Sequence, residues 1–141
     1  MRQVILQIAT ALALLAAPDF LAYAQPPGGQ CDQASKDLFG AAFYVKGGSN
    51  KSGVKEPKRK RSVDISLPSP WPQECRGPLA IHEALIAPSG KIEKVFALKI
   101  PCPQVDRAIT VAIQQWEYAP TLIDEKPVPV CITISTMMHP R

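Results

Sequence analysis

Residues 79–116, LAIHEALIAPSGKIEKVFALKIPCPQVDRAITVAIQQW, decide the fold of this chain. Two apolar-rich runs, Leu79–Ala87 and Lys91–Ile100, flank the turn signal Pro88-Ser89-Gly90, in which the glycine can adopt a positive φ. Such runs on either side of a short turn are typical of an antiparallel hairpin. We therefore predict two neighbouring strands that turn at Gly90.

A helix is predicted directly after the hairpin. Pro103 suits the first turn of a helix, where a missing N–H is tolerated, and Asp106 lies near the positive end of the helix dipole. Apolar residues then recur at spacings of four, three and four along one stripe: Val105, Ile109, Ala112 and Trp116. The stripe predicts an amphipathic helix with one buried face.

The run from Pro127 to Thr136 alternates between two kinds of side chain. One side carries Val128, Val130, Ile132 and Ile134, and the other carries Pro129, Cys131, Thr133 and Ser135. This period of two predicts a third strand with one buried face. The order strand, strand, helix, strand is that of a small α+β fold.

Residues 1–24 have the pattern of a secretory signal peptide. Arg2 supplies a positive charge, and Val4–Ala17 form an apolar run that is shorter than the roughly 20 residues of a transmembrane helix. Ala22-Tyr23-Ala24 offers the small-x-small pattern that a signal peptidase accepts. We expect cleavage after Ala24 and a periplasmic or secreted protein. A retained N-terminus would instead anchor the chain in the inner membrane.

Residues 25–70 are predicted to form a flexible, partly basic N-terminal segment and linker. Ala34–Val45 is a candidate for a short amphipathic helix, and the glycine-rich residues 47–53 indicate a flexible connection. Five cations follow: Lys55, Lys58, Arg59, Lys60 and Arg61. Two interpretations stay open, a solvated spacer or a patch that attracts an anionic envelope surface. A nucleic-acid partner is not expected for an exported protein.

Four cysteines occur, all after the expected signal peptide, and an even number in an exported chain favours two disulfides. If the hairpin turns at Pro88-Ser89-Gly90, facing residues have numbers that sum to about 178, and Cys75 with Cys102 comes within one of that sum. We therefore expect these two to meet at the open end of the hairpin. Cys31 and Cys131 then pair by elimination, which lays the N-terminal segment across the third strand.

The chain lacks the residue patterns of common catalytic sites. Its two histidines, His82 in the first strand and His139 near the C-terminus, are both expected at the surface. No G-x-S-x-G nucleophile motif, phosphate-binding glycine loop or C-x-x-C metal spacing occurs. We expect no catalytic residues, no metal, no cofactor and no small-molecule substrate.

A series of short motifs runs through residues 71–128. In order they are Trp71-Pro72, Gly77 before Leu79, Gly90-Lys91-Ile92, Val105-Asp106, Trp116-Glu117-Tyr118-Ala119-Pro120 and Asp124-Glu125-Lys126-Pro127-Val128. In this order they resemble the TonB C-terminal domain family, and the last two are the most specific. Three positions depart from the family pattern: Thr121 replaces alanine, Glu125 replaces the turn glycine, and Met137-Met138 replace an aromatic residue.

The resemblance implies a domain at residues 71–138 with a three-stranded antiparallel sheet, the third strand beside the first and one helix on a face. It implies core positions for Trp116, Tyr118 and Pro120. In this family the domain recognises a short extended segment of an outer-membrane receptor, which adds to a sheet edge and serves transmembrane transport. The resemblance therefore implies a partner-binding edge at the third strand: Val128, Val130, Ile132 and Ile134.

Two functions follow from these predictions. The first is an exported interaction module that binds a protein partner, either a receptor segment or another envelope protein. Energy transduction would also require an inner-membrane anchor, which the expected cleavage removes. The alternative is a secreted structural or envelope-binding protein that reuses the fold without a role in transport, because a fold does not fix a function.

Overall fold

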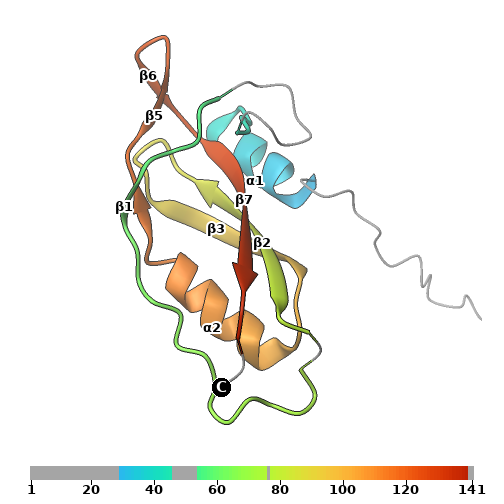
Figure 1. Cartoon of the computed structure of the whole chain (residues 1–141). Coiled ribbons are helices and arrows are strands. Elements are labelled where there is room, and N and C mark those ends of the chain that lie inside the picture. Colours follow the sequence, from blue (N-terminus) through green and yellow to red (C-terminus); the bar gives the residue numbers. More distant parts are fainter. Residues whose placement is uncertain (1–28, 46–53, 76, 140–141) are drawn as a thin grey trace, which may run out of the picture.

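The structure is a computed structural model that describes residues 29–45, 54–75 and 77–139. The expected signal peptide and the glycine-rich residues 47–53 lie outside the described residues. The elements are α1 (Gly29–Phe39), β1 (Arg59–Arg61), β2 (Leu79–Ile86), β3 (Ile92–Lys99), α2 (Pro103–Ile113), β4 (Glu117–Tyr118), β5 (Thr121–Ile123), β6 (Lys126–Val128) and β7 (Val130–Met137). They form an α+β fold, as the sequence predicts, in which a three-stranded sheet lies between two helices (Figure 1).

The central sheet has the strand order β3–β2–β7, and neighbouring strands are antiparallel. β2 and β3 form the predicted hairpin, and Gly90 in its turn has a φ of +88°. A Cβ atom at Gly90 would lie 2.0 Å from the carbonyl oxygen of Tyr118, so this close approach requires glycine. β7 pairs with the other side of β2, which confirms that the third strand lies beside the first.

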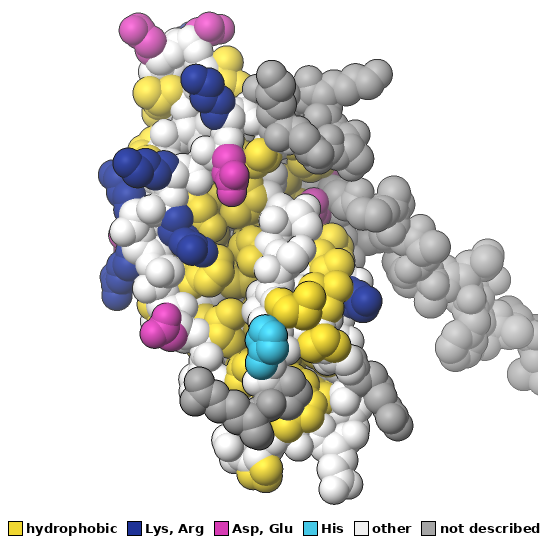
Figure 2. Space-filling model, in the orientation of Figure 1, with side chains coloured by type: hydrophobic (Ala, Val, Ile, Leu, Met, Phe, Trp, Pro, Cys, Tyr) yellow, Lys and Arg dark blue, Asp and Glu magenta, His cyan; other side chains and the backbone are white. Residues whose placement is uncertain are grey.

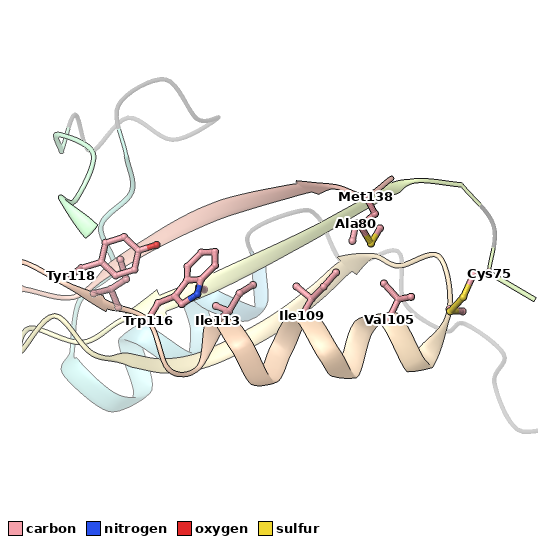
Figure 3. Packing of buried hydrophobic residues seen from close by; sticks show 11 residues of the cluster. Cys75, Ala80, Val105, Ile109, Ile113, Trp116, Tyr118 and Met138 are labelled. Atoms are coloured by element: carbon pink, nitrogen blue, oxygen red, sulfur yellow. A yellow bond between two sulfur atoms is a disulfide. The ribbon is translucent and has the colours of Figure 1, made fainter. Parts of the chain in front are cut away.

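α2 packs across one face of the sheet (Figure 3). Val105, Ile109 and Ile113 point from the helix toward the sheet and are fully buried. The helix ends at Ile113, earlier than the apolar stripe predicts, yet Trp116 turns back into the core and is only 8% exposed. Tyr118 is buried beside it, so both aromatic residues occupy the core positions expected of them.

α1 covers the opposite face near one end of the sheet. Its Cys31 and Ala34 pack in one cluster with Leu85 of β2 and Cys131 of β7. The sequence predicts this helix at residues 34–45, but it begins at Gly29 and ends at Phe39, because Gly40 takes a φ of +72°. The expectation of a single helix on the sheet was therefore incomplete, since each face carries one.

Residues 54–70, here called the strap, pack on the domain and do not form the flexible linker that their composition predicts. Val54 and Pro57 are buried, and β1 within the strap pairs with β4. The indole Nε1 of Trp116 donates a hydrogen bond to the carbonyl oxygen of Val63 at 2.9 Å. Alternate apolar residues of the strap contact the core on the α2 side of the sheet: Val63, Ile65 and Leu67.

The predicted third strand is interrupted at Pro129. Lys126–Val128 form β6, which pairs with β5 in a small hairpin, and β7 begins only after the proline. Asp124 and Glu125 turn this hairpin with φ values of 50° and 64°, a conformation that favours Asn, Asp and Gly. Pro120, which the resemblance places in the core, is exposed because it lies in the short connection between β4 and β5.

Both predicted disulfides are present. Cys75–Cys102 closes the open end of the hairpin with a Cα–Cα distance of 4.8 Å, and Cys31–Cys131 joins α1 to β7 with a Cα–Cα distance of 6.0 Å. The first bridge follows from the hairpin register, and the second places the N-terminal segment against the third strand. The described residues contain no helix that is both long and apolar enough to cross a membrane.

Candidate functional site

β7 forms one edge of the central sheet, and its register with β2 is unbroken from the pair Leu79–Met137 to the pair Ile86–Val130. All eight residues of β7 are uncharged, and none is proline. An edge strand leaves a row of backbone N–H and C=O groups without a strand partner. β7 is therefore a strand to which a further strand can be added, and it is the strand that the sequence analysis singled out.

The outward backbone groups of β7 belong to every second residue. The amide of Cys131 points away from β2, because it donates to the carbonyl oxygen of Phe43 at 2.8 Å. By the alternation of an antiparallel strand, Thr133, Ser135 and Met137 also direct their N–H and C=O groups outward. Within the residues that the structure describes, the outward groups of Thr133, Ser135 and Met137 have no backbone hydrogen bond.

The residues predicted for this edge are therefore not the ones whose backbone groups point outward. Val130, Ile132 and Ile134 direct their backbone groups toward β2 and their side chains toward the α2 core, which Ile132 and Ile134 contact. Val128 lies in β6 and pairs with Thr121, so it is not part of the edge. The alternation in the sequence identified the buried side chains of β7 correctly. The outward backbone groups, however, belong to the residues between them.

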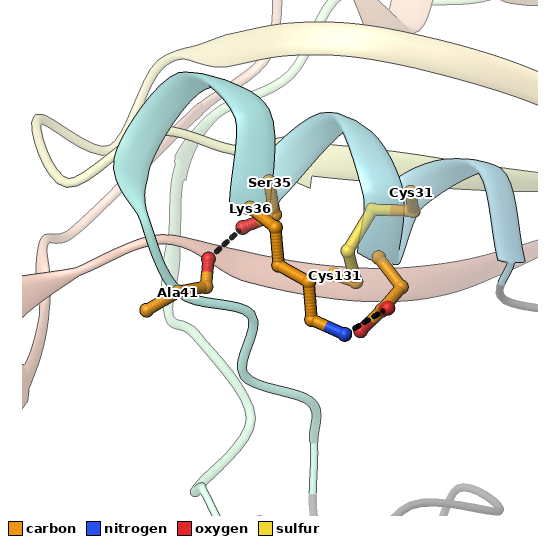
Figure 4. Close-up of a disulfide and its surroundings, with 6 residues drawn as sticks. Cys31, Ser35, Lys36, Ala41 and Cys131 are labelled. Carbon is orange, nitrogen blue, oxygen red and sulfur yellow. Dashed lines mark hydrogen bonds and ion pairs between the residues drawn. A yellow bond between two sulfur atoms is a disulfide. The ribbon is translucent and has the colours of Figure 1, made fainter.

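Residues 29–45, here called the clip, cover the first part of the β7 edge (Figure 4). α1 is joined to β7 through Cys31–Cys131, and the extended end of the clip forms a parallel bridge between Tyr44 and Cys131. Inside the clip, the Ser35 hydroxyl donates to the carbonyl oxygen of Ala41 at 2.5 Å. Among the residues that the structure describes, no strand or bridge other than β2 pairs with the stretch Thr133–Met137, here called the open part of the edge.

A buried carboxyl group lies beneath the clip. Glu83 of β2 is only 4% exposed and accepts a hydrogen bond from the backbone N–H of Cys31 in the first turn of α1. Burial raises the pKa of Glu83, the Cys31 N–H opposes this rise, and the nearby Asp32 carboxylate adds to it. Burial and a hydrogen bond to Asp32 also raise the pKa of Tyr44. The Tyr44–Asp32 bond ties the extended part of the clip to its helix.

Apolar side chains flank the open stretch on both sheet faces. On the α1 face, Ser135 and Met137 lie opposite Ile81 and Leu79 of β2, beyond the end that α1 covers, and Met137 is 60% exposed. On the α2 face lie the half-buried isoleucines of β7 described above. Figure 2 shows hydrophobic side chains on both sides of β7. An added strand would thus find apolar contacts above and below its backbone.

The opposite edge, β3, has a different character. It carries three charged residues, Glu93, Lys94 and Lys99, within eight. Its pairing with β2 shifts register twice, between Ile81 and His82 and again between Leu85 and Ile86. Charges and bulges are the features by which natural edge strands avoid pairing with other chains. Only the β7 edge of this sheet lacks both.

The basic residues lie on the strap and not on the β7 edge. Lysines and arginines gather along the side of the molecule where β1 runs (Figure 2). Arg59 stacks over the Trp116 ring, 4.4 Å from its centroid, and Arg61 lies 3.7 Å from Glu117. The remaining cations of the run are exposed and form no ion pair with any described residue: Lys55, Lys58 and Lys60.

His82 is fully buried, although the sequence analysis expects it at the surface. Its Nε2 lies 2.7 Å from Oδ1 of Asp106, and the Thr110 hydroxyl donates to the same oxygen at 3.4 Å. Its Nδ1 has no hydrogen-bond partner among the described residues. Because His82 points from β2 toward α2, the pair links sheet and helix. His139, in contrast, is exposed as expected.

No protein-family model matches this chain, and no curated protein matches it either. Two features of the chain bear on its function: the motif order in the sequence and the open edge at Thr133–Met137. The structure brings the open edge together with the clip and with Glu83. The basic residues of the strap lie in a separate sheet, whereas His82 lies opposite Ile134 of β7, with its side chain directed to α2 on the other face of the sheet from Glu83.

Proposed function

We propose that this protein is an exported interaction module, similar to TonB C-terminal domains, which binds an extended segment of a partner protein by strand addition at Thr133–Met137. The observation that carries the proposal is the contrast between the uncharged, regular β7 edge and the charged, bulged β3 edge. The two disulfides favour an oxidising compartment such as the periplasm.

Main-chain hydrogen bonds would supply much of the affinity. Each outward residue offers one N–H and one C=O, and each bond formed contributes about 0.5 to 1.5 kcal/mol net. Contacts with Met137 on one face and with Ile132 and Ile134 on the other would add an apolar contribution. A short edge of this kind suits a reversible interaction with a mobile segment of another protein.

The motif order in residues 71–128 favours an outer-membrane receptor as the source of that segment, and hence a role in TonB-dependent transport. A segment of another envelope protein would satisfy the same edge. Force transmission is a separate question that depends on the N-terminus. A mature chain that begins at Gln25 would rule out force transmission, whereas an intact Met1 in the inner membrane would restore it.

Site-specific photo-crosslinking in cells that export the protein tests the strand-addition proposal. A photoreactive residue at Met137, on the open edge, should yield a discrete adduct with one partner. The same residue at Glu93, on the β3 edge, should not. Ser135→Pro removes an outward N–H and should abolish the Met137 adduct. Equal adducts from both edges, or an adduct that survives Ser135→Pro, would contradict strand addition.

A second candidate function is attraction to an anionic envelope surface through the strap. It is favoured by Lys55, Lys58 and Lys60, which the folded strap holds at the surface without ion pairs to described residues. Replacing these three lysines by glutamine should lower binding to vesicles with anionic lipids, and salt should weaken the wild-type binding. Arg59 and Arg61 are left in place because they contact Trp116 and Glu117. Unchanged vesicle binding would exclude this function.

A further inference from the structure

The clip and the open edge meet at one residue of β7. Tyr44 forms its parallel bridge with Cys131, whereas the next residue, Val45, bridges Val54 of the strap. The clip therefore leaves β7 directly before Thr133, the first open residue. A strand that pairs along β7 from the C-terminal end would run into the clip at this point.

We propose that the clip is a register stop, which restricts a partner to the five residues Thr133–Met137, and that the Cys31–Cys131 disulfide holds this stop in place. The proposal rests on the proposed function, because it specifies which segment the same edge accepts. It assigns a specificity role to residues outside the edge itself: Cys31, Asp32, Phe43 and Tyr44.

Several contacts oppose displacement of the clip by a longer partner strand. The disulfide fixes α1 to β7, and Cys31 and Cys131 are both almost fully buried. The extended part of the clip is held to α1 at both ends. Ser35 donates a hydrogen bond to Ala41 at one end, and Tyr44 bonds to Asp32 at the other. A competing strand would have to break these bonds as well as the Cys131–Phe43 bond.

The stop also defines the chemistry of the partner. Antiparallel addition is favoured because it continues the pairing of the whole sheet. A partner residue opposite Ser135 would place its side chain on the α1 face beside the exposed Met137. Its neighbours would contact Ile132 and Ile134 on the α2 face. We therefore expect a segment of about five residues whose side chains are apolar or hydroxylated and carry no charge.

A tethered strand tests the stop without knowledge of the natural partner. The full chain is extended at its C-terminus by a flexible Gly-Ser linker and then by a strand of alternating threonine and valine, of either five or nine residues. The tether makes pairing intramolecular and raises the effective concentration of the strand to the millimolar range. Amide hydrogen exchange and nuclear Overhauser contacts then report pairing residue by residue.

Both strands should slow exchange at Thr133, Ser135 and Met137 by about tenfold or more, and the contact between the Cys131 amide and Phe43 should persist. The nine-residue strand should protect no further residue. In the Cys31→Ser/Cys131→Ser variant, the longer strand should replace Phe43 at position 131, whereas the shorter one should not. Tyr44→Phe, which keeps the disulfide but loses the bond to Asp32, should permit partial replacement.

The possible outcomes separate this inference from the proposed function. Loss of the Cys131–Phe43 contact when the nine-residue strand is attached to the disulfide-bonded chain would overturn the stop while leaving strand addition intact. The stop would also be overturned if the Cys131–Phe43 contact responded in the same way to both strands in the wild type, in Cys31→Ser/Cys131→Ser and in Tyr44→Phe. If neither strand slows exchange at Thr133, Ser135 and Met137, the open edge does not accept strands, and the proposed function fails with it.

Discussion

The two edges of the central sheet are protected in different ways. β3 is protected by its own sequence, because Glu93, Lys94 and Lys99 place charge along it and two register shifts distort it. β7 has neither feature and is instead covered at one end by a different part of the chain, the clip. Charge and bulges protect a whole strand, whereas a covering segment protects only the residues that it touches.

The difference shows how one sheet can keep one edge closed and leave part of the other open. The cover on β7 is covalent, since Cys31–Cys131 joins the clip to the strand that it protects. Its extent is therefore set by where Cys131 falls in β7. Changes to the clip should therefore act mainly on β7, although Phe96 of β3 also packs against the cluster around Cys31.

The largest effect is expected when the clip is released. Cys31→Ser/Cys131→Ser removes a crosslink with a sequence separation of 100 residues, which should lower the free energy of unfolding by about 4.7 kcal/mol. Urea denaturation measures this loss, and amide exchange should accelerate more at position 131, whose bond to Phe43 is released, than along β3.

The matched control is Cys75→Ser/Cys102→Ser, whose sequence separation of 27 residues predicts a loss of about 3 to 4 kcal/mol. This variant should leave exchange at Cys131 slow, since the clip stays attached. A clip variant that unfolds at the same urea concentration as the wild type would show that the disulfide does not stabilise this edge.

Proline substitutions should distinguish the inward and outward residues of β7. Thr136 faces Ala80 with its backbone groups directed to β2, so Thr136→Pro should cost about 1 to 3 kcal/mol, because a carbonyl of β2 loses its ladder bond. Thr133 directs its N–H outward, so Thr133→Pro should cost no more than about 1 kcal/mol. Chemical denaturation of the two variants checks the alternation. Equal losses would contradict the assignment of outward groups.

The sequence predicted the hairpin, α2, the third strand and the Cys75–Cys102 disulfide, because each depends on local periodicity or on the hairpin register. The place of the third strand beside the first was implied by the family resemblance, and Cys31–Cys131 followed by elimination. Trp116 and Tyr118 were likewise assigned to the core correctly. Their large apolar surfaces leave few other places for them in so small a domain.

The features that the sequence did not predict depend on contacts between distant segments. The strap has the composition of a linker, and contacts with distant residues order it: its hydrogen bond to Trp116, the pairing of β1 with β4, and the packing of its apolar residues on the core. The outward residues of β7 were missed because side-chain alternation does not report backbone direction. Cys131 was the available signal. It alternates with Ile132 along the strand, so the disulfide already showed that Cys131, Thr133 and Ser135 form a set distinct from the buried isoleucines.

The buried carboxyl under the clip predicts a dependence of stability on pH. Because folding raises the pKa of Glu83, its contribution to the free energy of unfolding is full below the usual value of 4.5 and is lost as pH rises through the raised pKa. Glu83→Gln should remove this loss, so that the variant gains stability relative to the wild type as pH rises from 4.5 toward neutrality. Urea titrations across this range measure the difference.

The control for this prediction is on the other edge. Glu93→Gln changes an exposed carboxylate of β3 and should keep the wild-type decline in stability with rising pH. A Glu83→Gln variant that declines in the same way would mean that the carboxyl beneath the clip is not the group responsible.

The smallest effect on stability is expected from a single charge placed on the open edge. Ser135→Lys adds to β7 the kind of residue that protects β3, and Ser135 is exposed, so the free energy of unfolding should change by no more than about 0.5 kcal/mol. Pairing should nevertheless be lost, because a strand added there would bury the charge against Ile81 and Met137. Amide exchange at Thr133 and Met137 in the chain with the tethered five-residue strand measures this loss.

Glu93→Lys, a charge change on the edge that is already protected, should leave both stability and pairing as they are. If the tethered strand still pairs in Ser135→Lys, charge does not protect this edge, and the contrast between β3 and β7 would have to rest on the register shifts of β3 alone.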